Sequence, residues 1–142
     1  MEQLVQFAQK AYIVNDDKLL IIKSRDYNVW EVPGGRKNLG EGLEEHVKRE
    51  VFEEIGVDIK PLQPFGISSF VHDKNGIEIV VVARLCRLDG EQTFKIEDSI
   101  TEYRWVDINQ SMLSDYKFPE NMMPVLMDLI KNYHLYKDIY LK

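Results

Sequence analysis

The chain has 142 residues, a length at which one domain can bury a hydrophobic core, and we expect a single domain over residues 1–142. Its formal net charge of -6 argues against broad binding to nucleic acid polymers, which relies on a basic surface. The N-terminal sequence lacks the features of a signal peptide, and no apolar run approaches the roughly 20 residues of a membrane-spanning helix. We therefore expect a cytoplasmic protein that binds neither a nucleic acid polymer nor a membrane.

The N-terminal segment is predicted to form strands. Residues 4–14 are rich in apolar, β-favourable side chains, and Asn15-Asp16-Asp17 is typical of a turn. Residues 18–25 continue as a second strand, so the two form a hairpin. Residues 29–32 are predicted to be a short extended segment, because Pro33 and the two glycines after it end the run.

A helix is predicted over residues 43–55. An aliphatic side chain recurs at every fourth position from Leu43 to Ile55, which indicates one apolar stripe against a core. Gly56 follows as a candidate for the residue that ends the helix.

The second half of the chain mixes strands and helices without regular alternation. In chain order the predicted elements are strands at 66–71 and 77–88 joined by a turn at 72–76, a weaker strand at 93–96, a strand at 103–106, a short helix from 109–113 and a helix at 121–133 with Pro124 in its first turn. This pattern indicates an α+β (mixed α/β) fold with helices packed on a central sheet.

Six glutamates lie between residues 41 and 54. On a helix Glu50, Glu53 and Glu54 share a face, so they form either a solvated acidic surface or a site for a cation. The preceding Pro-Gly-Gly segment favours a cation, since glycines allow a ligand to approach the backbone closely. Carboxylate oxygens suit Mg²⁺ or Mn²⁺, and Mg²⁺ commonly bridges a few carboxylates to substrate phosphates.

The spacing around these glutamates resembles a known motif. From Gly35 the chain reads Gly, five residues, Glu41, seven residues, and then REVFEEIGV at 49–57. This agrees at every fixed position with the Nudix box, Gly-x5-Glu-x7-Arg-Glu-U-x-Glu-Glu-x-Gly-U, where U is aliphatic. Seven fixed identities coincide by chance with a probability on the order of 10⁻⁹ per starting position. The chain thus resembles the Nudix hydrolase superfamily and its MutT-like nucleotide pyrophosphohydrolases.

The resemblance implies a fold and a reaction. The fold is an α/β/α sandwich with a central mixed sheet. The reaction is metal-dependent hydrolysis of a nucleotide pyrophosphate bond, such as conversion of a modified nucleoside triphosphate to a monophosphate and pyrophosphate. ADP-ribose, a nucleotide sugar and a dinucleoside polyphosphate are alternative substrates, and a non-catalytic nucleotide sensor is a further alternative. The cofactor is Mg²⁺, with Mn²⁺ as a substitute, the partner is a small nucleotide, and a homodimer is left open.

The resemblance also assigns roles within the box. Glu50, Glu53 and Glu54 correspond to metal ligands, and either Glu53 or Glu50 to the base that deprotonates the attacking water. Arg49 orients one of these glutamates as part of the catalytic group. The supporting positions are Glu41, which is a ligand or an anchor of the loop, and the geometric glycines Gly35 and Gly56.

A later loop offers one more metal ligand by the same resemblance. Glu97, Asp98 and Glu102 are the candidates in the acidic segment 97–102, which precedes a tryptophan-bearing strand, and Glu97 is favoured over Asp98. Solvation of an exposed loop explains these charges equally well.

Substrate contacts are assigned to the loop glycines and to nearby cations. Gly34, Gly35 and Arg36 belong to the loop before the helix, and Lys23, Arg25 and Arg36 can reach terminal phosphates or remain surface cations.

The segment Phe118-Pro119-Glu120-Asn121 resembles Phe-Pro-x-x-Asn of the MutT-type branch with one residue fewer, and there the asparagine reads a purine edge. Phe118 and Asn121 are therefore predicted to bind substrate, although Asn121 also suits a helix cap. Trp30 or Phe70 can stack on a base or belong to the core, and His46 is predicted to be structural.

Overall fold

The computed structural model describes residues 3–72 and 76–142. In chain order its elements are β1 (Val5–Asn15), β2 (Lys18–Ser24), β3 (Trp30–Glu31), β4 (Gly34–Arg36), α1 (Leu43–Ile55), β5 (Ile59–His72), β6 (Ile77–Leu88), β7 (Ile100–Asp107), α2 (Ser111–Asp115), a 3-10 turn (Glu120–Met122) and α3 (Met123–Tyr140). Within these residues, no helix has both the length and the apolar character needed to cross a bilayer.

Strand β1 lies at the centre of the sheet. It runs parallel to β6 from Val5 to Ile13, and its residues 8–10 pair with β4 in the antiparallel direction. Its last two residues, Val14 and Asn15, form the predicted hairpin with β2. The sheet continues from β6 to β5 on one side and from β2 to β3 and β7 on the other, all antiparallel. One parallel pairing among antiparallel ones makes the sheet mixed, which confirms the predicted fold class.

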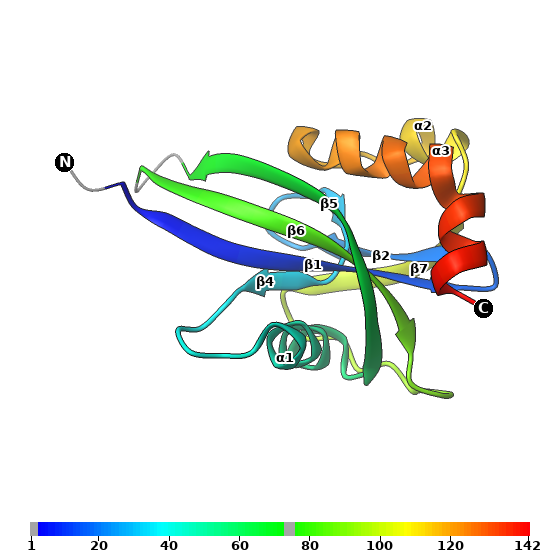
Figure 1. Cartoon of the computed structure of the whole chain (residues 1–142), viewed down its shortest axis with the longest axis horizontal. Helices are drawn as coiled ribbons and strands as arrows, with labels where there is room; N and C mark the ends of the chain where they lie inside the picture. Colours follow the sequence, from blue (N-terminus) through cyan, green and yellow to red (C-terminus); the bar gives the residue numbers. More distant parts are fainter. Residues whose placement is uncertain (1–2, 73–75) are drawn as a thin grey trace.

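Helices cover both faces of the sheet, with α1 on one face and α2 and α3 on the other (Figure 1). Side chains along β1 alternate between the two layers, as the pleat of a strand requires. Ala11 and Ile13 belong to a core cluster with the α1 residues Val47, Val51 and Ile55. Tyr12 and Val14 belong to the cluster on the α3 side. The two clusters confirm the predicted sandwich.

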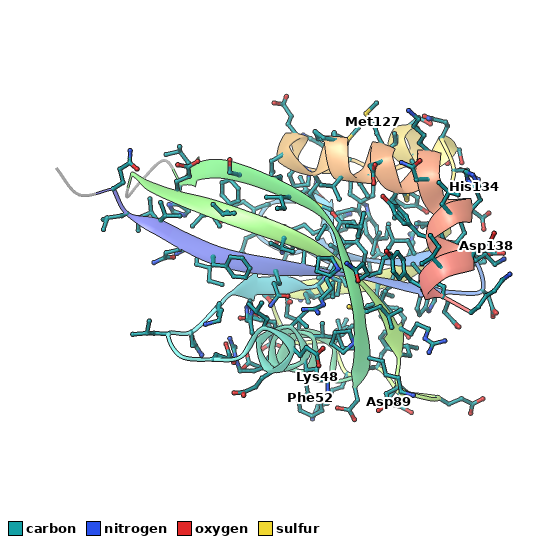
Figure 2. The ribbon with its side chains drawn as sticks, viewed as in Figure 1. Lys48, Phe52, Asp89, Met127, His134 and Asp138 are labelled. Atoms are coloured by element: carbon teal, nitrogen blue, oxygen red, sulfur yellow. The ribbon has the colours of Figure 1, made fainter. Side chains whose placement is uncertain are left out.

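The helix predicted over residues 43–55 is confirmed with the same bounds. Val47, Val51 and Ile55 are fully buried, as the apolar stripe predicts. Gly56 ends the helix with φ +70°, and its N–H donates to the carbonyl of Phe52 at 2.9 Å. Figure 2 shows Lys48 and Phe52 on the side of α1 that faces away from the sheet.

The strand predicted at 93–96 is wrong. The N–H groups of Lys95 and Glu97 donate to the carbonyls of Ile55 and Glu54, at 2.9 and 3.0 Å. These carbonyls lie at the C-terminal end of α1, where the helix itself supplies no donors. The segment is therefore extended along the end of the helix and pairs with no strand of the described residues.

Other boundaries also differ. Strand β5 begins at Ile59 rather than at residue 66, and it accommodates Pro61 and Pro64 at register shifts, where proline is tolerated. The short helix spans Ser111–Asp115 rather than 109–113. Helix α3 begins and ends later than the predicted 121–133. In the turn predicted at 72–76, residues 73–75 lie outside the described part of the chain.

Candidate active site

Two consecutive glycines bring the backbone of β4 against the carboxylates of α1. Gly34 has φ +149°, and a Cβ there would lie 2.2 Å from the carbonyl oxygen of Gln9. Its N–H donates to Oε1 of Glu54 at 2.7 Å. At Gly35 a Cβ would lie 2.6 Å from Oε2 of Glu50. Any larger residue at either position would displace the strand or a glutamate.

Replacing Gly35 with alanine should therefore disturb Glu50. We expect the free energy of unfolding to fall by about 1–3 kcal/mol from overpacking, and kcat to fall because the carboxylate moves. Gly42→Ala is the control for kcat, since its φ is −67° and the Cβ would meet no atom closer than 4.0 Å. Denaturant unfolding and steady-state hydrolysis measure both effects, and equal kcat values for the two variants would contradict the prediction.

Among the carboxylates of Glu50, Glu53 and Glu54, that of Glu54 is half-buried and accepts the N–H of Gly34. Burial, as the main cause, raises the pKa of Glu54 from 4.5 to about 7, and nearby Glu50 and Glu31 raise it further. Lys10 and the N–H of Gly34 act in the opposite direction. A carboxylate held in such surroundings favours either a proton or a cation beside it.

Arg49 binds three other glutamates of the box. Its guanidinium contacts Glu41 through Nε and Nη2 at 2.5 and 3.0 Å, and through Nη1 it lies 3.2 Å from both Glu50 and Glu53. Its hydrogen bonds, as the main cause, lower the pKa of Glu41 to about 2. Glu41 also accepts the N–H of Asn38 at 3.1 Å, so the pair anchors the loop before α1.

The carboxylates fit a divalent cation in their chemistry, although they do not converge as a finished site. Within the described residues, no three His, Cys, Asp or Glu side chains are grouped closely enough to hold a metal ion. The observation that fits a cation is Glu54, whose burial beside Glu50 penalises its charge unless a positive group lies nearby. Glu50 and Glu54 would hold the ion, and Glu53, whose side chain is 54% exposed, can turn towards it.

The loop that contains Glu97 lies beside the end of α1. The backbone of Glu97 is bonded to that of Glu54, while its exposed side chain accepts a hydrogen bond from the hydroxyl of Ser99. Arg25 donates from Nε to the carbonyl of Asp98 at 2.7 Å, which fastens it to the same loop. The loop thus brings a predicted metal ligand and a predicted phosphate contact to the helix end.

A cavity of about 330 Å³ opens beside Gly35 on the α3 side of the sheet. Its polar lining residues are Lys10, Glu31, Arg36, Ser68 and Asn121, and its apolar walls include Tyr12, Phe70, Ile79, Val81 and Val125. Because Gly35 lines the cavity and also touches Glu50, the cavity adjoins the carboxylates.

Asn121 lies on the cavity wall and caps neither helical segment. The N-cap residues of the 3-10 turn and of α3 are Pro119 and Met122, and neither N-cap makes a side-chain hydrogen bond. Phe118, by contrast, is 7% exposed and packs in the core on the α3 side. Lys23 and Trp30 lie away from the cavity lining, with Lys23 Nζ 5.8 Å from the centre of the indole ring of buried Trp30.

Two charged residues of the site escaped the sequence analysis. Lys10 Nζ lies 3.8 Å from Glu31 and 3.4 Å from the carbonyl oxygen of Val32, and both charged side chains line the cavity. The available signal was Lys10 itself, a charge in the middle of a strand that is otherwise mostly apolar. Buried Gln9 and His46 were also missed as a pair.

The comparisons with known proteins agree with this arrangement. The family model described as the NUDIX domain matches residues 6–128. The chain therefore belongs to the NUDIX domain family, and its α/β/α sandwich is that of a Nudix hydrolase.

Relatives that carry the name of an activity include diphosphatases of 8-oxo-dGTP and a pyrophosphatase of ADP-ribose. The 8-oxo-dGTP diphosphatase of Buchnera aphidicola is 25% identical over 84% of this chain and 88% of that relative. The ADP-ribose pyrophosphatase of Methanocaldococcus jannaschii is 35% identical over 68% of this chain and 59% of that relative. The match to a putative 8-oxo-dGTP diphosphatase of Bacillus subtilis, 36% identical, spans 35% of this chain and 36% of that relative.

Solved structures show the same fold. The MutT NUDIX hydrolase from Burkholderia pseudomallei has a TM-score of 0.73 at 22% identity, covering 88% of this chain and 98% of that one. The E. coli ORF135 protein has a TM-score of 0.78 at 17% identity, covering 94% of both chains.

Proposed function

We propose that the chain hydrolyses the pyrophosphate bond of a small nucleotide with the help of Mg²⁺, or of Mn²⁺ in its place. The observation that carries this proposal is Gly35, which contacts the carboxylate of Glu50 and also lines a cavity large enough for a ligand group. On this proposal a nucleotide with its base in the cavity would have its phosphates near Glu50 and Glu54.

A bound divalent cation would neutralise phosphate oxygens and activate water for attack on phosphorus. Glu50 and Glu54 would hold it, with Glu97 as a further ligand from the neighbouring loop. Glu53 is the proposed base, because it is the most exposed of the three helix carboxylates and is oriented by Arg49. Arg36 on the cavity wall and Arg25, which is bonded to the Glu97 loop, are the proposed phosphate contacts, and Lys23 lies outside the cavity lining.

As substrate we propose a purine nucleoside triphosphate, cleaved to a monophosphate and pyrophosphate. Asn121 supports this choice, because its amide lies on the cavity wall without a capping role and offers both a donor and an acceptor to a base edge. The relative named 8-oxo-dGTP diphosphatase supports the same choice. ADP-ribose is the second candidate, supported by the relative named ADP-ribose pyrophosphatase.

A nucleotide panel tests the proposal. Normal and oxidised nucleoside triphosphates, ADP-ribose, a nucleotide sugar and a dinucleoside polyphosphate are incubated with the protein and Mg²⁺, and the products are identified by chromatography. We expect one class to be cleaved, and Glu53→Gln to lower kcat on that class by roughly 10²–10⁴-fold through loss of the base.

Glu45→Gln is the control, since Glu45 is exposed on the same helix and lies outside the hydrogen bonds and ion pairs of the site described above. A Glu53→Gln protein as active as the wild type would remove Glu53 from catalysis. A wild-type protein that binds nucleotides and cleaves none of them would favour the sensor instead.

A further inference from the structure

A chain of buried hydrogen bonds lies between α1 and the sheet, next to the glutamates. Gln9 on β1 is 1% exposed and His46 on α1 is 0% exposed. Nε2 of Gln9 lies 2.7 Å from the carbonyl oxygen of Leu43 and 2.8 Å from Nδ1 of His46. Nε2 of His46 lies 2.9 Å from the carbonyl oxygen of Gly35. Buried polar groups that are fully paired in this way hold their surroundings in one arrangement.

The direction of each hydrogen bond follows from Arg84 on β6. A guanidinium only donates, and Nη1 of Arg84 lies 3.2 Å from Oε1 of Gln9, so the amide oxygen faces Arg84. The amide NH₂ therefore donates to Leu43 and to Nδ1 of His46. Since Nδ1 accepts, the proton of the imidazole is on Nε2 and is donated to Gly35. With this assignment each of the hydrogen-bonded groups of Gln9 and His46 has a partner.

We propose that His46 is a positioning residue of the active site, which acts by holding Gly35 against Glu50. His46 and Glu50 are one helical turn apart on α1 and contact the same glycine. The imidazole contacts the carbonyl of Gly35, while Oε2 of Glu50 lies so near that a Cβ at this position would be 2.6 Å from it. His46 thereby sets the distance between Glu50 and the cavity that Gly35 lines. The inference rests on the proposed function in one respect, namely that Glu50 takes part in catalysis.

Two substitutions separate this role from simple packing. His46→Leu fills much of the space but removes the side-chain donor to the carbonyl of Gly35 and leaves one N–H of the Gln9 amide without its acceptor. We expect kcat to fall by roughly 10–100-fold, as for other groups that orient a catalytic ligand. The KM for the nucleotide should change little, because His46 does not line the cavity. His46→Gln returns an amide donor to the carbonyl of Gly35 and should recover most of the lost kcat, whereas Glu45→Gln should match the wild type.

Nuclear magnetic resonance gives a readout that does not depend on activity. In the wild-type protein the imidazole nitrogens of His46 should show the Nε2–H tautomer. The carbonyl ¹³C signal of Gly35 should shift in His46→Leu and return towards the wild-type position in His46→Gln. An Nδ1–H tautomer, an unchanged Gly35 signal in folded His46→Leu, or an unchanged kcat would overturn the proposal. If His46→Leu does not fold, the wild-type tautomer decides: the Nε2–H form supports the proposal and the Nδ1–H form overturns it.

These readouts keep the two proposals apart. A wild-type protein that cleaves none of the nucleotides contradicts the proposed function. The tautomer and the Gly35 signal still support or overturn the hydrogen bond from His46 to Gly35. A protein that cleaves nucleotides but shows no change in His46→Leu retains the proposed function and loses the role of His46.

Discussion

Glu50→Gln should lower kcat by roughly a thousandfold, which corresponds to about 4 kcal/mol of lost transition-state stabilisation. We expect no neighbouring carboxylate to take over the role of Glu50. Its side chain is 16% exposed and lies between Nη1 of Arg49 and the backbone of Gly35. A glutamine has nearly the same shape, so packing against Gly35 is retained. The change removes one negative charge and places an NH₂ group where a carboxylate oxygen would meet a cation.

The measurement is hydrolysis as a function of Mg²⁺ concentration. We expect Glu50→Gln to need more Mg²⁺ for half-maximal activity as well as to lose kcat. Glu45→Gln carries the same chemical change on the exposed part of the helix and should behave as the wild type. Thermal unfolding without metal should show that Glu50→Gln is folded. Activity within tenfold of the wild type at every Mg²⁺ concentration would remove Glu50 from the proposed site.

The parts of this arrangement that could be predicted from the sequence are local ones. The helix over 43–55 follows from one apolar residue per turn, and its end follows from Gly56, so both were found with the observed bounds. The spacing of the box also places Glu50, Glu53 and Glu54 on one helix. The spacing does not predict how the three glutamates differ in solvent exposure, because the exposure depends on which strand lies beside the helix.

That strand, β4, is three residues long and consists of Gly34, Gly35 and Arg36, so neither composition nor alternation predicts it. It forms because β1 offers residues 8–10 as partners. Glu54 is enclosed by this pairing and Glu53, one residue earlier, is not. The same reasoning explains the strand wrongly predicted at 93–96, whose backbone donors are taken by the end of α1. In both places a distant segment decides where hydrogen bonds form.

The roles of Lys10 and His46 have the same origin. A single charge within a strand or a histidine within a helix has no local signature, since its partners come from other elements. Lys10 on β1 pairs with Glu31 on β3, and His46 on α1 pairs with Gln9 on β1. Phe118 and Asn121 show the converse, because two residues of one motif are separated by the fold into core and cavity wall.

The stability of the metal-free protein should fall as the pH rises from about 4.5 to about 7. Glu54 has a pKa of about 7 in the folded protein and an ordinary value of 4.5 when exposed. Between these values the unfolded chain releases a proton that the folded chain retains, so folding becomes less favourable with each pH unit. The total change is on the order of 3 kcal/mol, lost by pH 7 and fully present below pH 4.5.

Glu54→Gln isolates this effect. Glutamine can still accept the N–H of Gly34 through its side-chain oxygen, while it cannot ionise. Urea unfolding at several pH values should therefore give a shallower decline for Glu54→Gln than for the wild type or for Glu45→Gln. A decline of equal slope in all three proteins would show that Glu54 does not bind a proton in the folded state.

Mg²⁺ should act on the same carboxylate in the opposite sense. A cation beside Glu54 favours the ionised form, so binding below pH 7 has to release the proton that burial retains there. The stabilisation by Mg²⁺ should thus be larger at pH 8 than at pH 5, and it should nearly vanish in Glu54→Gln. Stabilisation that is equal at both pH values would place the ion away from Glu54. Stabilisation that grows with pH and disappears in the variant ties the buried carboxylate to the metal.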